Sequence, residues 1–301
     1  MKKRRERRSR DGRSVLTAVL IWVSCIILAV IIAVIIGNAL GKEAGKIKPG
    51  YENGAPEIFE YSGQTVPSVS ATAVINPYGK GDDGIDSIIS SLPSGTTAVS
   101  IYLKADSLAP SYKSAVYTAV SGNTGGRSDL SRAVKILHDK NIRVCACFDA
   151  TSPSVKDKDA RDAALNYEAA LISEAFASGI DDITICGLPS DNYGVAYASE
   201  LFKLAREKNP SSVLGAGIPY KVMMSSAAAG AVSDYSSFAD FCAVDMSDLD
   251  ENSTEETVAS GLSYYFREYP LRVIMMTGET SVSSRVETLG RLGIYNVQVK
   301  K

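Results

Sequence analysis

The chain has 301 residues, of which 45% are hydrophobic and 22% charged, and its net charge at neutral pH is −2. Residues 1–14 hold eight basic and two acidic side chains, so the remaining residues carry a net charge of −8. That acidic balance argues against a protein that binds nucleic acid or another polyanion.

An uncharged apolar run follows the basic N-terminal segment, because no charged residue occurs between Arg13 and Lys42. Residues 15–40 exceed the roughly 20 residues that cross a bilayer core, so they predict one transmembrane helix. The basic residues 1–14 should remain cytoplasmic, which puts everything after the helix outside the cell membrane. A cleavable signal peptide is an alternative, but its apolar region is normally only about 7–15 residues. A nucleic-acid-binding arm is the other alternative for the basic run.

Residues 41–70 are rich in Gly, Pro, Ser and Lys and show no sustained periodicity. They predict a linker that holds the next domain away from the membrane, and whether this linker docks on the domain is left open. Residues 71–301 are long enough to bury one sizeable core.

Short β-branched or apolar runs recur along residues 71–301 and alternate with helical patterns. The runs are 71–76, 98–103, 142–148, 183–187, 213–218, 241–246, 272–277 and 296–299. The clearest helical patterns are 129–139, 159–178, 195–208, 221–231, 255–268 and 282–292. This alternation predicts an α/β fold with a parallel sheet, and eight strands predict a (β/α)8 barrel of the TIM type whose last helix is missing.

A doubly wound open sheet is the second choice. It would favour a Gly-rich phosphate loop after a strand, but residues 122–126 follow no strand directly and lack the G-x-G-x-x-G spacing. Four of the five cysteines, Cys145, Cys147, Cys186 and Cys242, fall within predicted strands. We expect buried hydrophobic side chains there rather than zinc ligands, which usually lie two to four residues apart on loops. No metal and no cofactor is predicted.

Alternation along the strands sorts the side chains by face. The larger aliphatic residues should face the helices, so the polar residues should point into the barrel and gather at the C-terminal ends of the strands. The candidates for ligand binding at this mouth are Tyr102, Lys104, Asp106, Asp191, Tyr220 and Glu279, together with Asp149 and Asp245.

One helix–strand unit carries a recognisable motif. A helical pattern ends at Gly179, a buried strand runs from Ile183, and Pro189 interrupts it. Residues 179–190 read GIDDITICGLPS, residues 99–105 read VSIYLKA, and residues 137–142 read LHDKNI.

These motifs resemble G-F-D-E-I-x-F-D-Y-I-R-F-P-S, V-V-I-D-V-K-D and L-H-x-K-G-I of an uncharacterised bacterial glycoside-hydrolase-like (β/α)8 family. That family is membrane-tethered or secreted and is distantly similar to amylase- and chitinase-type barrels. The resemblance covers roughly residues 71–301 and implies the barrel fold. The motif's aspartate is Cys186 here, its arginine is absent, and the aspartate of the earlier strand is Tyr102. The implied hydrolase activity is therefore expected to be lost.

Glycosidases normally use two carboxyl groups, about 5–5.5 Å apart in retaining enzymes and about 6.5–9.5 Å apart in inverting ones. Asp149 and Asp245 are the candidates for an acid/base pair at the wider spacing. The alternative is that each caps a loop or pairs with Lys104, Lys221 or Lys300. The single histidine, His138, is predicted at a helix end away from the mouth, which leaves no histidine for a catalytic triad or a metal site.

Several tyrosines are predicted in or near the loops of the mouth, where their rings would suit sugar rings or simply pack the loops: Tyr112, Tyr117, Tyr193, Tyr197 and Tyr220. The leading hypothesis is a membrane-anchored extracytoplasmic barrel that binds a cell-envelope or extracellular glycan without cleaving it. An active glycosidase that uses Asp149 and Asp245 and a protein-interaction scaffold of the cell envelope are the alternatives.

Overall fold

The computed structural model describes residues 70–71, 73–105, 109–151, 157–188, 191–223 and 232–246, together with strands at 271–276 and 297–300. All of these residues belong to one compact unit, Pro56–Lys301. The predicted membrane helix at 15–40, most of the linker at 41–70 and the helical patterns at 255–268 and 282–292 lie outside the described residues.

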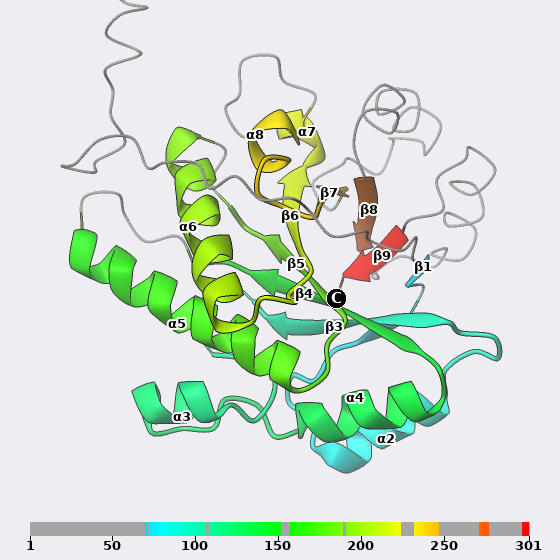
Figure 1. Cartoon of the computed structure of the whole chain (residues 1–301). Helices are drawn as coiled ribbons and strands as arrows, with labels where there is room; N and C mark the ends of the chain where they lie inside the picture. The colour runs from blue at the N-terminus through cyan, green and yellow to red at the C-terminus, as the bar shows by residue number, and fades with distance from the viewer. Residues whose placement is uncertain are drawn as a thin grey trace, which may run out of the picture. The chain divides into compact units, whose positions relative to one another are not determined.

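The described strands form one sheet in which every neighbouring pair is parallel, in the order β1-β9-β8-β7-β6-β5-β4-β3-β2 (Figure 1). Their bounds are β1 Ser70–Ala71, β2 Ala73–Ile75, β3 Ala98–Lys104, β4 Arg143–Asp149, β5 Asp182–Cys186, β6 Leu214–Pro219, β7 Phe241–Asp245, β8 Leu271–Met276 and β9 Val297–Lys300.

The sheet closes on itself because β1 and β2 are separated by one residue only. β1 pairs with β9, and β2 pairs with β3. The two halves of this first stretch therefore join the two ends of the strand order, and each predicted run contains a strand. The prediction of an α/β barrel with parallel strands is confirmed.

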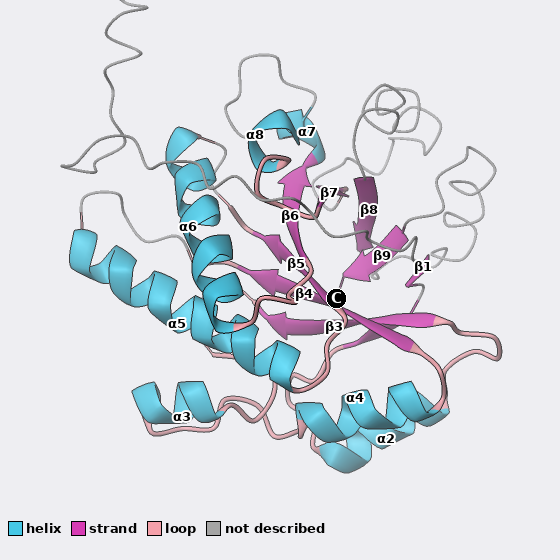
Figure 2. Cartoon of the chain, in the orientation of Figure 1, coloured by secondary structure: helices cyan, strands magenta, loops and turns pink. Residues whose placement is uncertain are grey.

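From β2 to β7, helices lie between successive strands and outside the sheet (Figure 2). The long ones are α4 Leu130–Asp139, α5 Lys158–Ala177 and α6 Asn192–Lys208, and the short ones are α2 Asp82–Ser90, α3 Ala115–Ser121, α7 Tyr220–Met223 and α8 Val232–Tyr235. The sequence patterns predicted the long helices and missed α2, α3 and α8. The helical pattern at 221–231 is described only as far as Met223.

Local sequence explains where the long helices begin and end. Asp129, Asp157 and Asp191 precede α4, α5 and α6, and each carboxylate accepts a hydrogen bond from a backbone N–H in the first turn. Gly179 follows α5 with a φ of 97°, a conformation that a residue with a Cβ rarely adopts. The predicted role of Gly179 as the stop of this helix is confirmed.

Small residues on one strand make room for larger ones on its neighbours inside the barrel. Cys186 of β5 clusters with Phe241 and Ala243 of β7, although β6 lies between these strands. β6 presents Gly215 and Gly217 there: a Cβ on Gly215 would overlap the Phe241 ring, and one on Gly217 would lie 2.6 Å from Cys186 Sγ. The interior is therefore filled by residues that meet across β6.

This packing predicts the cost of adding one methyl group. Gly215→Ala should lower the free energy of unfolding by about 1–3 kcal/mol, because the barrel interior has no space for it. Gly84→Ala is the control: its Cβ would make only ordinary contact with Lys80, so a helical alanine should raise stability by about 0.5–1 kcal/mol. Chemical denaturation measures both. If Phe241→Leu does not recover part of the loss in the double variant, the Phe241 ring is not the cause.

Candidate functional site: the mouth of the barrel

The C-terminal ends of the parallel strands form the mouth, and two aspartates end strands there. β4 ends at Asp149, β5 at Cys186 and β7 at Asp245. The strand registers place Asp149 beside Cys186 and Asp245 beside Pro219 of β6. The two aspartates predicted as an acid/base pair therefore lie on the same rim, at the ends of different strands.

Asp149 is held by a tyrosine of the neighbouring strand. The Tyr102 hydroxyl donates a hydrogen bond of 2.5 Å to Asp149 Oδ2. A hydroxyl that donates to a carboxylate at this length restricts the orientation of the carboxylate. Tyr102 thus takes the place that the resemblance gives to an aspartate and serves instead to orient Asp149.

A second aromatic residue at the mouth, Tyr78, follows β2 and was not among the predicted site residues. Its ring lies 6.2 Å from that of Tyr102, centroid to centroid, with the planes tilted by 60°. Its hydroxyl accepts from the backbone N–H of Ala105 and donates to the carbonyl of Ala109, each at 3.0 Å. The sequence signal that would have found it is its position three residues after the first strand.

Cys186, which stands where the family motif has an aspartate, is buried against Phe241 and Ala243. Its backbone carbonyl accepts from the N–H of Ala150 at 2.8 Å, which extends the pairing of β4 with β5 past Asp149. At this position the chain therefore carries a buried thiol and not a carboxylate. The predicted role of Cys186 as a buried packing residue is confirmed.

The prediction that Lys104 points into the mouth is wrong. Between Tyr102 and Lys104 the register with β4 shifts by one residue, so that Tyr102 lies opposite Cys147 but Lys104 lies opposite Phe148. Such a β-bulge turns the following side chain to the other face of the sheet. The Lys104 ammonium accordingly lies 5.0 Å from the centre of the Phe148 ring and 3.1 Å from Glu168 of α5.

The pair of Lys104 and Glu168 is completely buried, with both side chains at 0% exposure. The ammonium also donates to the carbonyl oxygen of Asp149 at 2.6 Å and to Thr151 Oγ1 at 2.7 Å. Glu168 accepts from the N–H of Thr151 at 2.6 Å and from the Tyr197 hydroxyl at 3.0 Å. Burial raises the pKa of Glu168, and Lys104 with these hydrogen bonds offsets part of that rise.

The other predicted ligand-binding residues are placed as follows. Asp191 caps α6 and accepts from the N–H of Gly194 at 2.8 Å, and Tyr220 is the first residue of α7, directly after β6. Both therefore lie at the rim of the mouth. Asp106 and Glu279 lie outside the described residues.

Four of the tyrosines predicted near the mouth lie in the helix layer or pack against it. Tyr112 is buried, and its hydroxyl donates to Glu174 of α5 at 3.2 Å. Burial and this carboxylate raise the pKa of Tyr112 far above its usual value. Tyr197 is buried against Glu168, whereas Tyr117 packs beside Tyr167 with the two ring centres 6.5 Å apart. Tyr193 is likewise buried.

His138 lies on the opposite side of the barrel, as predicted. Its Nε2 lies 3.0 Å from Asp181 Oδ2, just before the N-terminal end of β5. The same oxygen accepts from the N–H of Val144 at the start of β4. His138 is thus part of a structural contact at the bottom of the barrel.

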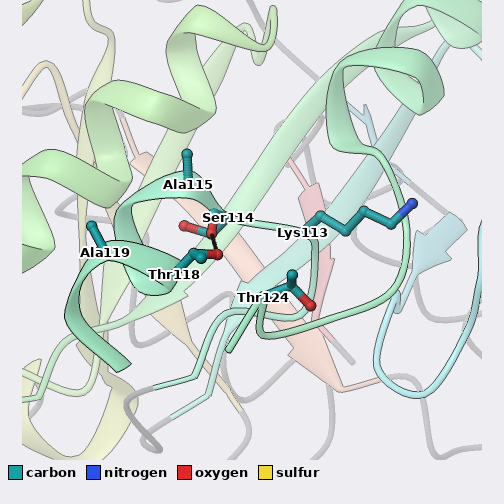
Figure 3. Close-up of a pocket in the computed structure, with 6 residues that line it drawn as sticks. All are labelled: Lys113, Ser114, Ala115, Thr118, Ala119 and Thr124. Atoms are coloured by element: carbon teal, nitrogen blue, oxygen red, sulfur yellow. Dashed lines mark hydrogen bonds between the residues drawn. The ribbon is translucent and has the colours of Figure 1, made fainter. Parts of the chain in front are cut away.

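Hollows also lie outside the barrel, along α3. One, of about 470 Å³, is lined by Lys113, Ser114, Ala115, Thr118, Ala119 and Thr124, and Figure 3 shows Thr118 bonded to the Ser114 carbonyl while the Lys113 side chain extends away from them. Another, also of about 470 Å³, runs between α3 and α5 and is lined by Tyr117, Val120, Ser121, Thr151, Ala160, Ala163, Ala164 and Tyr167. Neither of these two is lined by a carboxylate.

Within the part of the chain that the structure describes, no three potential ligands among His, Cys, Asp and Glu are grouped closely enough to hold a metal ion. No helix in the described ranges has both the length and the apolar character for a bilayer crossing. The run at 15–40 lies outside those ranges.

No protein-family model matches the chain, and no curated protein matches it. Among solved structures, the 6-hydroxypseudooxynicotine amine oxidase of Pseudomonas geniculata N1 matches 84% of this chain and 47% of its own, with a TM-score of 0.51 and 10% identity. A putative deoxyribose-phosphate aldolase from Coccidioides immitis matches 80% of this chain and 87% of its own, with a TM-score of 0.49 and 12% identity. A hypothetical protein from Ruminiclostridium thermocellum ATCC 27405 matches 48% and 96% of the two chains, with a TM-score of 0.36 and 18% identity. The match to the amine oxidase shows a shared fold and nothing further.

Because the cysteines are buried, we expect their thiols not to react with an alkylating reagent in the native protein. Cys145, Cys147, Cys186 and Cys242 are all buried thiols, and desolvation raises the pKa of Cys242 to about 12. Native protein treated with iodoacetamide at about pH 8 should leave these four unmodified, whereas denatured protein should be labelled at all of them. Peptide mass spectrometry reads out each site. Rapid labelling of Cys186 in the native protein would show that the mouth floor is open to solvent.

Proposed function

We propose that the barrel mouth binds a carbohydrate and does not cleave it. The observation that carries this proposal is the group of Tyr78, Tyr102 and Asp149, in which two adjacent tyrosine rings accompany a carboxylate fixed by a 2.5 Å hydrogen bond. A carboxylate accepts hydrogen bonds from sugar hydroxyls, and aromatic rings suit the apolar faces of sugar rings. Few precisely placed polar groups among apolar ones are typical of small-molecule sites.

The lack of cleavage is inferred from the position that should supply charge. A glycosidase stabilises an oxocarbenium-like transition state with a carboxylate, and the motif position for that carboxylate holds the buried thiol of Cys186. The resemblance to glycoside-hydrolase-like barrels supports a carbohydrate as the ligand, whereas the thiol of Cys186 argues against glycoside hydrolysis.

An active glycosidase is the second candidate, and the strand ends favour it over other reactions. Asp149 ends β4 directly beside Cys186, and Asp245 ends β7. A pair of this kind would move the acid and base one strand away from the motif position. The two candidates predict opposite results with the same substrates.

The binding test uses chitotetraose, cellotetraose and maltotetraose, titrated into the protein in a calorimeter. At least one should bind, and both Asp149→Asn and Tyr102→Phe should weaken that affinity by about tenfold, the equivalent of one lost hydrogen bond. Asp139→Asn is the matched control, because Asp139 lies on the surface of α4 and pairs there with its neighbour Lys135 at 2.6 Å. If none of the three binds, a glycan site of this class is excluded.

The same preparations decide between binding and cleavage. Aryl glycosides should be hydrolysed no faster than in buffer, since loss of a catalytic carboxylate costs orders of magnitude in rate. Turnover that disappears in Asp149→Asn or Asp245→Asn would instead establish the active glycosidase.

We also propose that residues 15–40 anchor the barrel in the cell membrane with the barrel outside. The basic segment 1–14 and the uncharged apolar run after it support this orientation. The anchor would hold the mouth near the cell-envelope glycans that the binding proposal requires.

Protease added to intact spheroplasts that express the chain should degrade the barrel and leave the N-terminal segment protected. Lysed spheroplasts, in which both sides are accessible, are the control. A barrel that resists the protease until lysis would place it in the cytoplasm and overturn the orientation.

A further inference from the structure

Hydrogen bonds on both faces of the sheet hold the strand end that carries Asp149. On the inner face, the Tyr102 hydroxyl holds the Asp149 side chain. On the outer face, Lys104 and Glu168 hold the backbone of the same strand end, from Asp149 to Thr151. Both sets of contacts involve residues of β3. Tyr102 and Lys104 lie two residues apart on this strand but, because of the bulge, on opposite faces of the sheet.

The contacts of Lys104 and Glu168 on the outer face restrict the backbone from Asp149 to Thr151. The Lys104 ammonium donates to the carbonyl of Asp149, to Thr151 Oγ1 and to Glu168, so three protons meet three acceptors. Glu168 Oε1 in turn accepts from the N–H of Thr151. The Tyr197 hydroxyl bonds Glu168 Oε2 and lies 3.3 Å from the Thr151 carbonyl. Rotation of a peptide unit between Asp149 and Thr151 would break at least one of these buried bonds.

A fixed backbone fixes the direction in which the Asp149 side chain leaves it. A hydrogen bond as short as the one from Tyr102 requires the phenol and the carboxylate to stay aligned. That alignment is set by the Asp149 carbonyl, which Lys104 holds, because a shift of the carbonyl moves the Cα–Cβ bond with it. The buried ion pair on the helix side and the carboxylate in the mouth are thus parts of one arrangement.

We propose that Lys104 and Glu168 are positioning residues for Asp149: together they set the strand end so that its carboxylate presents a fixed geometry to a ligand in the mouth. The claim about geometry stands on the contacts of the two residues, and its consequence for affinity rests on the proposed carbohydrate binding.

The test separates positioning from a purely structural role through the double variant Lys104→Met/Glu168→Gln. Exchanging a whole buried ion pair for neutral side chains of similar size is often neutral for stability. The amide that replaces the Glu168 carboxylate still offers an oxygen to the N–H of Thr151 and a polar group to Tyr197. The thioether that replaces the Lys104 ammonium no longer holds the Asp149 carbonyl. The double variant should therefore still unfold cooperatively but lack the hydrogen bond from residue 104 to the Asp149 carbonyl.

The readout that needs no ligand is the hydroxyl proton of Tyr102 in the NMR spectrum. In the wild type, its short hydrogen bond should give a downfield resonance, identified by its loss in Tyr102→Phe. In Lys104→Met/Glu168→Gln this resonance should move upfield or vanish through exchange with water. Affinity for the tetrasaccharide that the wild type binds should fall by about tenfold.

The matched control is another buried ion pair, Arg206 with Asp240, whose atoms are 2.8 Å apart. It lies by the N-terminal ends of β6 and β7, where Asp240 Oδ2 accepts from the N–H of Leu214. Arg206→Met/Asp240→Asn removes a comparable pair at the end of the barrel opposite to the mouth. The Tyr102 resonance and the affinity for the tetrasaccharide should therefore not change.

An unchanged Tyr102 resonance and unchanged affinity in a folded Lys104→Met/Glu168→Gln would overturn the proposal. If the double variant does not fold, Tyr197→Phe decides the question. This variant removes the hydroxyl bonds to Glu168 and Thr151 and should shift the resonance in the same direction by less; no shift there would also reject positioning. A shifted resonance in a protein whose wild type binds none of the tetrasaccharides would uphold positioning and reject the proposed function.

Discussion

A buried ammonium group must place all of its protons on acceptors, because an unmet charge away from water costs several kcal/mol. Lys104 meets this constraint with a backbone carbonyl, a hydroxyl and a carboxylate, which come from β4, the residues just after it and α5. No one of these elements can shift without leaving the charge short of a partner. The end of β4 and the middle of α5 are therefore fixed relative to each other, and the geometry of the mouth depends on that relation.

The barrel interior imposes a second constraint, which is one of volume. Phe241 and Cys186 occupy the space left by the two glycines of β6, so apolar atoms fill the interior next to the rim. Asp149 ends β4 at the level of Cys186, and Asp245 ends β7 two residues after Ala243. Asp149 and Tyr78 are half-buried, whereas Tyr102 and Asp245 are buried. A ligand that enters the mouth would therefore meet the Asp149 carboxylate and the Tyr78 ring. This arrangement suits a molecule with hydroxyl groups on its edges and an apolar face, as sugar rings have.

The strands were predictable because each is a short run of apolar residues between breaks, and burial on both faces of a parallel sheet requires such runs. The direction of Lys104 was not predictable, since simple alternation carries no sign of the bulge that reverses it. The tyrosines show the same limit: Tyr112 and Tyr197 were expected near the mouth, but each hydroxyl bonds a carboxylate on α5 instead. The short helix α3 does carry local signals, because Ser114 caps it by accepting from the N–H of Tyr117 and Gly122 ends it with a φ of 75°; these signals were overlooked in a segment of only seven helical residues. Contacts between distant residues decided the cases of Lys104 and the tyrosines.

The two constraints act on different residues, so the packing at position 186 and the ion pair that holds the end of β4 are separate requirements. A carboxylate at position 186 would stand against Phe241 and Ala243, where its charge would be poorly solvated. A thiol at that position fills the space without this cost, so an exchange from aspartate to cysteine is not opposed by folding. Removal of the Glu168 carboxylate alone would instead leave the Lys104 charge buried and incompletely paired. The residues that hold the mouth in shape are thus under a stronger physical requirement than position 186, so under the proposed function a carboxylate could be absent there without loss of the binding geometry.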